Sequence, residues 1–191
     1  CNAAISACEK DGQWPMALSL LASMSLAGVQ PDTISYNSAM SVCEKSEQWE
    51  RSLRLWSCMS AADLVPTVVS YSTIISGCGK ADQWQLALSF LARMPVARVA
   101  PDKFSCSAAI SACEKGGQWQ LALELLARTS AVDVRPDVIS FNAAISACEK
   151  GGQWQQAQSL LRSMRAEHLV PDQVSYNAAI SACEKGGEWQ L

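Results

Sequence analysis

The most constraining feature of this sequence is a ten-residue phrase that returns at a fixed interval of 35 residues. ISACEKGGQW stands at 110–119 and, unchanged, at 145–154, and close variants stand at 5–14 and 180–189. A period of about 20 to 50 residues is typical of solenoids, in which each unit packs only against its neighbours. The interval therefore predicts a stacked repeat array rather than one globular core.

Four residue types keep the same register along the 191-residue chain. They are the tryptophans Trp14, Trp49, Trp84, Trp119, Trp154 and Trp189, the cysteines Cys8, Cys43, Cys78, Cys113, Cys148 and Cys183, the lysines Lys10, Lys45, Lys80, Lys115, Lys150 and Lys185, and the prolines Pro31, Pro66, Pro101, Pro136 and Pro171. This register divides the chain into repeats at 1–32 (partial), 33–67, 68–102, 103–137, 138–172 and 173–191 (partial). Because the sequence begins and ends inside a repeat, we expect it to be a segment of a longer array.

The first half of each repeat has the apolar spacing of an amphipathic helix. In the repeat 33–67 this stripe consists of Tyr36, Ala39, Met40 and Cys43. We expect the helix to be capped by a serine, namely Ser35, Ser70, Ser105, Ser140 or Ser175 in the successive repeats. It should end near Lys45, or at the Gly-Gly pairs of later repeats, which puts a lysine at the negative end of the helix dipole.

A second helix is predicted to begin at the tryptophan of each repeat. Its stripe in the repeat 33–67 consists of Trp49, Ser52, Leu53, Trp56 and Met59. Pro15 suits the first turn of such a helix, whereas Pro95 predicts that its helix ends or kinks near Met94. A helical hairpin of this size cannot bury its own stripe, so the predicted fold class is all-α, an α-solenoid of stacked helix–turn–helix repeats.

Composition and charge limit the classes of function. Apolar residues make up 49% of the chain, which is too many for a disordered protein. A net charge of −3 and a pI near 5.2 do not by themselves indicate binding to a polyanion. The uncharged stretch 12–31 contains Gln13, Pro15 and Gln30, so we interpret it as a soluble helix rather than a membrane span.

The tryptophan and cysteine ladders each have a functional and a structural interpretation. The tryptophans would serve either as stacking platforms for bases or as core between helices, and their phase with the leucines favours the core. A zinc site is not predicted, because there is no Cys-x-x-Cys and His168 is the only histidine. Packed helix axes lie about 8–10 Å apart, farther than the roughly 4.4–6.8 Å between bridged Cα atoms. The cysteines are therefore predicted to be buried thiols in a reducing compartment.

No catalytic site is predicted in this segment. The sequence offers no nucleophile–base pair and no glycine-rich phosphate loop, and its acids recur as ladders rather than as a unique cluster. The His-x-Glu and Cys-x-x-Cys elements of a deaminase are also missing from it. We therefore predict no enzymatic activity, cofactor, metal or small-molecule substrate, with an appended catalytic domain beyond Leu191 as an open alternative.

Two small polar ladders stand at positions where repeats of this kind differ. One follows the aromatic position of each first helix, at Asn2, Asn37, Ser72, Ser107, Asn142 and Asn177, and the other follows the proline, at Asp32, Thr67, Asp102, Asp137 and Asp172. The whole unit, PD-x-[VI]-S-[YF]-N…K-G…A…L…M…P, resembles the pentatricopeptide repeat in its plain 35-residue class. A tetratricopeptide repeat would have a period of 34 and a Trp–Leu–Gly–Tyr signature, which is missing here.

The resemblance implies sequence-selective binding of single-stranded RNA, at about one nucleotide per repeat. It pairs each residue after the aromatic with the residue after the following proline: Asn2 with Asp32 for U, Asn37 with Thr67 for a pyrimidine, Ser72 with Asp102 and Ser107 with Asp137 for G, and Asn142 with Asp172 for U. Asn177 has no partner within the chain. Read from the N-terminus, the implied site is 5′-U-Y-G-G-U-3′. The apolar residues that would flank the bases are Ile34, Val69, Phe104, Ile139 and Val174.

A purely structural interpretation of the same residues is also open. The Asn and Ser residues would then be ordinary early-turn helix residues, and Asp32 and its equivalents would complement the helix dipole.

Charge at the ends of the first helices gives two opposing expectations. The resemblance implies a phosphate track along the six lysines Lys10, Lys45, Lys80, Lys115, Lys150 and Lys185, with a log–log salt slope of about −4 if each neutralised one phosphate. The residue just before the lysine is a glutamate in five cases, Glu9, Glu44, Glu114, Glu149 and Glu184, and a glycine, Gly79, before Lys80. We expect these carboxylates to point into the groove more directly than the lysines, which disfavours tight binding of a polyanion.

The first functional hypothesis is an RNA-binding module that acts in organellar RNA processing or stability, located in a mitochondrion or plastid by family resemblance. The alternative is a protein–protein interaction scaffold that holds an extended peptide in the same concave groove. The acidic ladder and the low pI favour this alternative.

Overall fold

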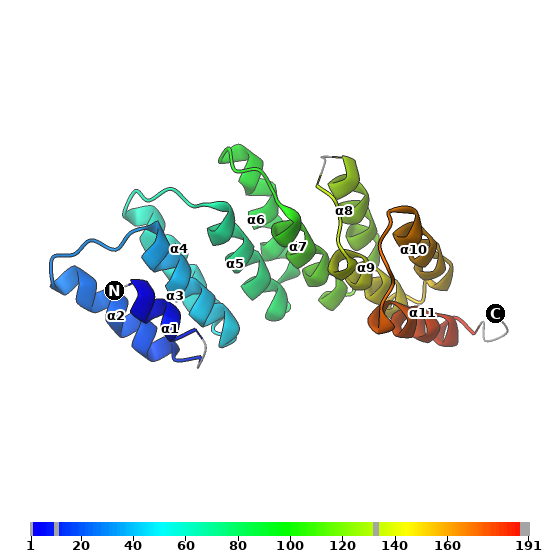
Figure 1. The fold of residues 1–191 in the computed structure, drawn as a ribbon, viewed down its shortest axis with the longest axis horizontal. Helices are drawn as coiled ribbons and strands as arrows, with labels where there is room; N and C mark the ends of the chain where they lie inside the picture. Colours follow the sequence, from blue (N-terminus) through cyan, green and yellow to red (C-terminus); the bar gives the residue numbers. More distant parts are fainter. Residues whose placement is uncertain (1, 10–11, 132–133, 188–191) are drawn as a thin grey trace.

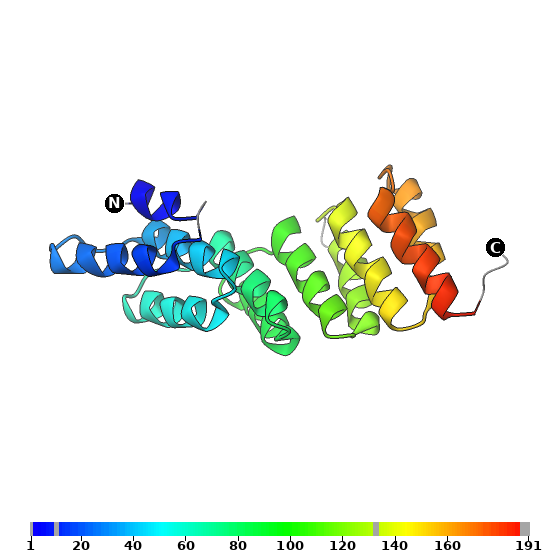
Figure 2. The same ribbon diagram turned by 90° about the horizontal axis from the view of Figure 1, so that it is seen from below.

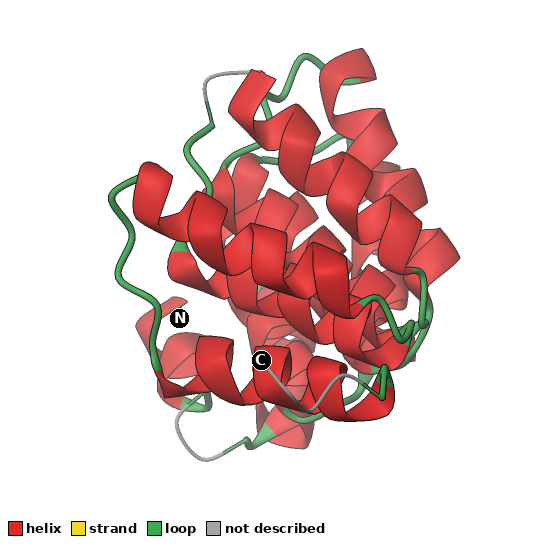
Figure 3. Ribbon diagram, turned by 90° about the vertical axis from the view of Figure 1, so that its right-hand side faces the viewer, coloured by secondary structure: helices red, strands yellow, loops and turns green. Residues whose placement is uncertain are grey.

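The computed structural model describes residues 2–9, 12–131 and 134–187, and these ranges contain eleven α-helices and no β-strand (Figures 1 and 3). The first helices of the repeats are α1 (Asn2–Ala7), α3 (Thr33–Lys45), α5 (Val68–Lys80), α7 (Lys103–Lys115), α9 (Val138–Lys150) and α11 (Gln173–Lys185). The second helices are α2 (Trp14–Leu26), α4 (Trp49–Ala61), α6 (Trp84–Val96), α8 (Trp119–Ala131) and α10 (Trp154–Ala166). The predicted all-α solenoid is thus confirmed.

The helices stack into an elongated array. Each first helix packs against the first helices of the neighbouring repeats, and each second helix packs against its own first helix and the next one. Figure 2 shows α7, α9 and α11 side by side, with α8 and α10 behind them. The first helices therefore form one continuous row. No described helix is long and apolar enough to cross a membrane.

The start of each first helix differs from the prediction. The N-cap is not the serine but the residue three positions earlier, namely Asp32, Thr67, Asp102, Asp137 and Asp172 in the successive repeats. Asp32 Oδ1 accepts from the backbone N–H of Ser35 at 2.8 Å, and the Ser35 hydroxyl accepts from the backbone N–H of Asp32 at 3.2 Å. This reciprocal capping box satisfies two orphan donors, so the serine is buried at the third helical position.

The helix ends follow the prediction closely. Every described first helix from α3 onward ends at its lysine. Pro15 lies in the first turn of α2, where its missing N–H costs nothing. Pro95 lies in the last turn of α6, which ends at Val96, so this proline does not shorten the helix relative to its equivalents.

The core consists of small and branched side chains at the helix seams. Ile5, Met40, Ile75, Ile110 and Ile145 take equivalent positions in successive first helices and are fully buried. The ladder cysteines Cys8, Cys43, Cys78, Cys113 and Cys148 are buried beside them, as predicted. Burial raises the pKa of the Cys43, Cys78, Cys113 and Cys148 thiols to about 11, so these thiols stay protonated at neutral pH.

The tryptophans form the seam between repeats, as predicted. Trp14, Trp84, Trp119 and Trp154 are half-buried and pack against the core. Gly116, at the end of α7, faces the Trp84 ring so closely that a Cβ has no room, and Gly151 faces Trp119 in the same way. These rings therefore dock one repeat onto the next and are not stacking platforms. Trp189 lies outside the described residues.

Two positions of the fourth repeat carry smaller side chains than their equivalents. Cys106 stands where the other repeats have Tyr36, Tyr71, Phe141 and Tyr176, and Thr129 stands where they have Met24, Met59, Met94 and Met164. A cavity of about 520 Å³ opens between α6 and α8, lined by Leu88, Leu121, Cys106 and Thr129 among others. Two small residues in place of two large ones account for this space.

Candidate nucleic-acid interface

The structure brings together the pairs of residues that were predicted to read bases. The Asn2 amide nitrogen donates to Asp32 Oδ1 at 3.2 Å, and the Asn142 amide nitrogen donates to Asp172 Oδ1 at 3.0 Å. Asn37 donates to the Thr67 hydroxyl at 3.2 Å. Each bond joins one first helix to the N-cap of the next, so the pair lies at the junction between two repeats.

A buried serine completes each of these asparagine junctions. The Ser35 hydroxyl lies 2.7 Å from Asn2 Oδ1, and the Ser70 hydroxyl lies 2.7 Å from Asn37 Oδ1, each donating to the amide oxygen. These contacts agree with the structural interpretation, because the paired residues cap helices and join repeats. An Asn2-type side chain keeps one amide N–H that is not used inside the junction.

Hydrogen bonding holds the capping carboxylates in their charged form. The backbone N–H of Ser35 is the main cause that lowers the pKa of Asp32, and the Ser35 hydroxyl adds to it. The backbone N–H of Ser175 likewise lowers the pKa of Asp172, helped by Asn142. Each acid keeps a second carboxylate oxygen at an exposed position, available as an acceptor.

The two serine junctions differ from the asparagine junctions and from each other. The Ser72 hydroxyl donates to the Val68 carbonyl at 2.8 Å, and no described bond joins it to Asp102. Ser107 is only 8% exposed, and its hydroxyl lies 2.7 Å from Ser140 and 3.4 Å from Asp137. Ser72 is thus open to the groove, whereas Ser107 is sealed in the packing and leaves Asp137 to face the groove. Asn177 is exposed on α11.

The predicted base-flanking residues are all exposed. Between 55% and 64% of their surface is accessible at Ile34, Val69, Phe104, Ile139 and Val174. A regular row of exposed apolar side chains on one face is typical of an interaction surface. Between α5 and α7 this row borders a pocket of about 400 Å³ lined by Val69, Phe104, Ser72 and Asp102.

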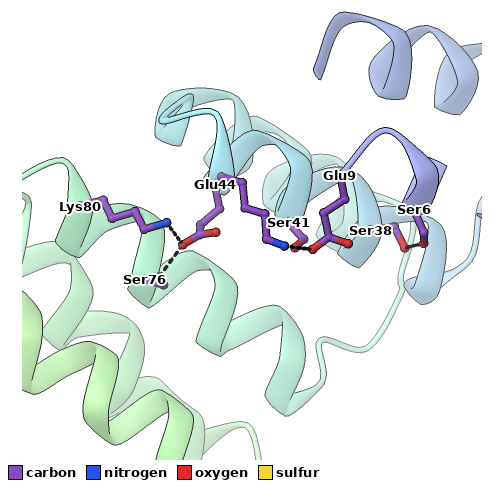
Figure 4. A network of polar contacts seen from close by, with 8 residues as sticks. Ser6, Glu9, Ser38, Ser41, Glu44, Ser76 and Lys80 are labelled. Atoms are coloured by element: carbon purple, nitrogen blue, oxygen red, sulfur yellow. Dashed lines mark hydrogen bonds and ion pairs between the residues drawn. The ribbon is translucent and has the colours of Figure 1, made fainter. Parts of the chain in front are cut away.

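The expectation that the glutamates point into the groove more directly than the lysines is wrong for four of the five, which are less exposed than the lysines they meet, although Glu44 also lines the α5–α7 pocket. Each of these four lies between two first helices and meets the lysine of the next repeat, at 2.9 Å for Glu9 with Lys45 and 2.8 Å for Glu44 with Lys80 (Figure 4). Glu114 with Lys150 (2.6 Å) and Glu149 with Lys185 (2.9 Å) repeat the arrangement. We call each such pair a clasp, and the glutamates in the four clasps are only 11–29% exposed. Lys10 lies outside the described residues.

Three of these ion pairs are reinforced by a serine on the same helix as the lysine. The Ser41 hydroxyl donates to Glu9 at 2.7 Å, Ser76 donates to Glu44 at 2.6 Å, and Ser181 donates to Glu149 at 3.0 Å. The Ser41 and Lys45 bonds lower the pKa of Glu9 below its usual value. Burial acts to raise the pKa of Glu149, but Lys185 and Ser181 outweigh it and lower the pKa.

Sequence reasoning did not identify the clasp as a contact between repeats. A serine ladder at Ser6, Ser41, Ser76, Ser111, Ser146 and Ser181 runs in the same 35-residue register and was the available signal. A serine four residues before each lysine lies on the same helix face, so the two can share one carboxylate of the preceding repeat.

One junction has no clasp. Gly79 takes the glutamate position in α5, and no described carboxylate pairs with Lys115 at the end of α7. A Cβ at Gly79 would lie 2.9 Å from the Cβ of Ala112, so the glycine allows α5 and α7 to approach closely. This is also the junction of the Ser72–Asp102 pocket. In the described ranges, no group of three or more His, Cys, Asp or Glu side chains is arranged to hold a metal ion.

Comparison with known families identifies the repeats. The family described as PPR repeat family matches residues 31–80, 66–115 and 136–185, which is more than half of the chain, and the PPR repeat matches residues 1–29 and 104–128. No curated protein matches the chain.

Solved structures of the same architecture cover nearly the whole chain. Pentatricopeptide repeat protein PPR10 in complex with an 18-nucleotide psaJ RNA element is 25% identical with a TM-score of 0.79, over 97% of this chain and 27% of that one. The PPR domain of Arabidopsis thaliana protein-only RNase P 1 in complex with tRNA is 14% identical with a TM-score of 0.68, over 78% of this chain and 82% of that one. Arabidopsis thaliana nuclear protein-only RNase P 2 is 14% identical with a TM-score of 0.72, over 96% of this chain and 41% of that one. The chain thus spans about a quarter of the length of PPR10.

Proposed function

The chain belongs to the pentatricopeptide repeat family, and from this premise we propose that it binds single-stranded RNA selectively, with about one base at each junction between first helices. The observation that carries the proposal is the α5–α7 pocket. Its wall includes the two apolar residues Val69 and Phe104 and the polar pair Ser72 and Asp102. Glu44 also lines it, with its carboxylate paired to Lys80. Apolar faces that stack on a base and polar groups that meet its edge are the two elements of single-strand recognition.

The chemistry of each pair supports a different base. At an asparagine junction, the spare amide N–H of Asn142 donates to a carbonyl oxygen of uracil, while the free oxygen of Asp172 accepts from the uracil N3–H. At the α5–α7 junction, Asp102 accepts from the N–H groups on the guanine edge and the Ser72 hydroxyl oxygen is within the same pocket. The proposed site for the array is 5′-U-Y-G-G-U-3′, with the fourth position read by Asp137 alone.

The role we propose is binding rather than chemistry. A bound segment of transcript is protected or positioned, as in organellar RNA processing or stability, with a mitochondrion or plastid as the proposed location. PPR10 supports an RNA partner, since it is 25% identical over 97% of this chain and its structure contains an RNA element.

A protein–protein interaction scaffold is the second candidate. The net charge of −3 favours it, because a polyanion is repelled by an acidic surface. The clasps leave this net charge unchanged, since each of them pairs one carboxylate with one lysine.

The direct test is binding of 5′-UUGGUU-3′ against a scrambled RNA of the same composition, at about 50 mM and about 200 mM salt. RNA readout predicts tighter binding of the ordered sequence at both salt concentrations. Equal affinity for both RNAs would exclude base readout, and no binding of either at the lower salt would favour the protein scaffold.

The assignment of pairs to bases has a separate test. Ser72→Asn should change the preference at the third nucleotide from G to a pyrimidine, and Asn142→Ser should change the fifth from U to G. Each variant is the control for the other, since they alter opposite ends of the array in opposite directions. Preferences that stay unchanged in both variants would exclude the assigned register.

A further inference from the structure

Resting on the proposed function, we propose that the junctions do not hold RNA equally, and that the α5–α7 junction is the anchor of the array. A base enters the pocket between Val69 and Phe104, and a phosphate of the same segment binds Lys115. The other junctions add selectivity with less affinity. Three differences at this one junction support the inference.

The first difference is the availability of positive charge. Lys45, Lys80, Lys150 and Lys185 are each within 3 Å of a glutamate carboxylate. A phosphate that approaches one of them must replace a carboxylate that is already in place and partly buried, so the exchange yields little net free energy. Lys115 has no such competitor among the described residues, because Gly79 occupies the glutamate position.

The second difference is the availability of polar groups for the base. At α1–α3 and α9–α11 the asparagine amide is already bonded on both its nitrogen and its oxygen side. At α5–α7 the Ser72 hydroxyl donates only within its own helix, and Asp102 Oδ1 accepts only from its own helix N-terminus. The pair is therefore not committed across the junction, and a base can use both members without breaking a contact between repeats.

The third difference is space. The pocket at this junction measures about 400 Å³ and is bordered by exposed apolar side chains on both sides, with Phe104 63% exposed and Val69 59% exposed. Ligand sites commonly lie in the range of about 300–1,000 Å³. Phe104 is also the only aromatic residue in the base-flanking row, and an aromatic face stacks better on a base than an aliphatic one.

The two halves of the anchor lie at compatible positions along the groove. Lys115 is seven residues after Ala108, which lines the pocket on α7, and this corresponds to about 10 Å along the helix axis. A lysine side chain spans part of this distance, and the remainder is comparable to the separation of a base from its backbone phosphates. One nucleotide and its flanking phosphates can therefore reach both the pocket and Lys115.

The salt dependence of binding follows from this arrangement. Six lysines that each release one counterion predict a log–log slope of about −4, whereas a single available lysine predicts about −0.7. We expect a shallow slope, between these limits and nearer the second.

The test compares two variants, each of which replaces one positively charged side chain with glutamine. Lys115→Gln should weaken binding of 5′-UUGGUU-3′ about five- to tenfold and reduce the salt slope by about 0.7, as expected for the loss of one charge-assisted phosphate contact. Arg162→Gln is the charge-matched control on the exposed side of α10, and it should weaken binding less than twofold. Equal losses in the two variants would overturn the inference, because general charge rather than Lys115 would then explain the binding.

A second variant tests the clasps in the opposite direction. Glu149→Gln removes the carboxylate that occupies Lys185, so binding should tighten severalfold and the salt slope should steepen by about 0.7. Unchanged affinity and slope would show that clasped and unclasped lysines are equivalent, which contradicts the anchor.

If the unaltered protein binds no RNA, the proposed function fails together with the anchor. If it binds but Lys115→Gln has no effect, the anchor alone fails. Circular dichroism of each variant confirms that the helices are intact.

Discussion

The α5–α7 and α9–α11 junctions are built on the same 35-residue frame but use their polar side chains differently. At α9–α11, Glu149 is clasped by Lys185 and Ser181, and Asn142 is bonded to both Asp172 and Ser175. At α5–α7 the corresponding positions are Gly79, Lys115, Ser72 and Asp102, and no described bond joins them across the junction. A closed junction stabilises the array, whereas an open one leaves its groups for a ligand.

The open junction is also looser on its opposite face. The cavity between α6 and α8 belongs to the same pair of repeats, and it exists because Cys106 and Thr129 are smaller than their equivalents. The buried core also divides near here, since Ala109 and Ala112 pack with the N-terminal cluster and Ile110 and Cys113 with the C-terminal one. Between repeats three and four, the first helices α5 and α7 thus approach closely, whereas a cavity remains between the second helices α6 and α8.

The largest expected effect tests the close approach of α5 and α7. Gly79→Ala places a Cβ 2.9 Å from the Ala112 Cβ, so the two helices must separate at a cost of about 1–3 kcal/mol. Gly77→Ala is the matched control, because its Cβ would make ordinary contacts with Glu44 at 3.6 Å and Trp49 at 4.0 Å, and it should stabilise the helix by up to ~1 kcal/mol. Urea unfolding should therefore separate the two variants by about 2 kcal/mol in favour of Gly77→Ala. Equal stabilities would show that the junction is not tightly packed at Gly79.

The second prediction fills the space behind the open junction. Cys106→Phe with Thr129→Met restores residue types that stand at these positions in other repeats, Phe141 and Met164. We expect the double variant to gain about 1–2 kcal/mol in unfolding free energy, since each added apolar group is removed from water. The same exchange made in reverse, Phe141→Cys, should lose a similar amount. A loss of stability in the double variant would mean that the cavity cannot accept the larger side chains.

Much of this contrast lies beyond what the sequence predicts. The period, the helix ends at Lys45 and its equivalents, and the buried cysteines follow from local spacing, because helix geometry fixes which side chains share a face. The clasp joins residues 36 apart, such as Glu149 and Lys185, and becomes visible only when successive first helices are aligned. The sequence predicts Ser35 rather than Asp32 as the N-cap because either residue type is a good N-cap, and only the structure shows that the two bond each other reciprocally.

The third prediction concerns the pH dependence of the closed junctions. The folded-state pKa values of Glu9 and Glu149 are lowered, so the clasps contribute stability above the usual glutamate value of 4.5, and this stability is lost as the pH falls through the lower folded pKa. The thermal midpoint should therefore fall when the pH is reduced from neutral to below 4.5. In Glu149→Gln this fall should be smaller, and the variant should be less stable at neutral pH by about 1 kcal/mol. Identical pH profiles would show that the Glu149 clasp adds nothing to stability.

The smallest expected effect on stability concerns the turn between the two helices of a repeat, which differs between the earlier and later repeats. Glu47 and Asp82 adopt positive φ values of 58° and 60°, whereas Gly117 and Gly152 take the equivalent positions in later repeats. A left-handed conformation costs a residue with a side chain about 1 kcal/mol, which glycine avoids. Glu47→Gly should thus raise the thermal midpoint slightly, and Gly117→Glu should lower it. A fall in the midpoint of Glu47→Gly would indicate that the Glu47 side chain makes a stabilising contact.

The contrast between open and closed junctions is tested most directly by removing one base at a time from bound RNA. Six versions of 5′-UUGGUU-3′, each with one abasic position, are titrated against the unaltered protein and compared with the complete RNA. An anchor at α5–α7 predicts the largest loss of affinity at the third nucleotide, with smaller losses at the nucleotides that face the asparagine junctions. The same loss at every position, or a maximum at the fifth nucleotide, where α9–α11 is closed by its own bonds, would contradict it.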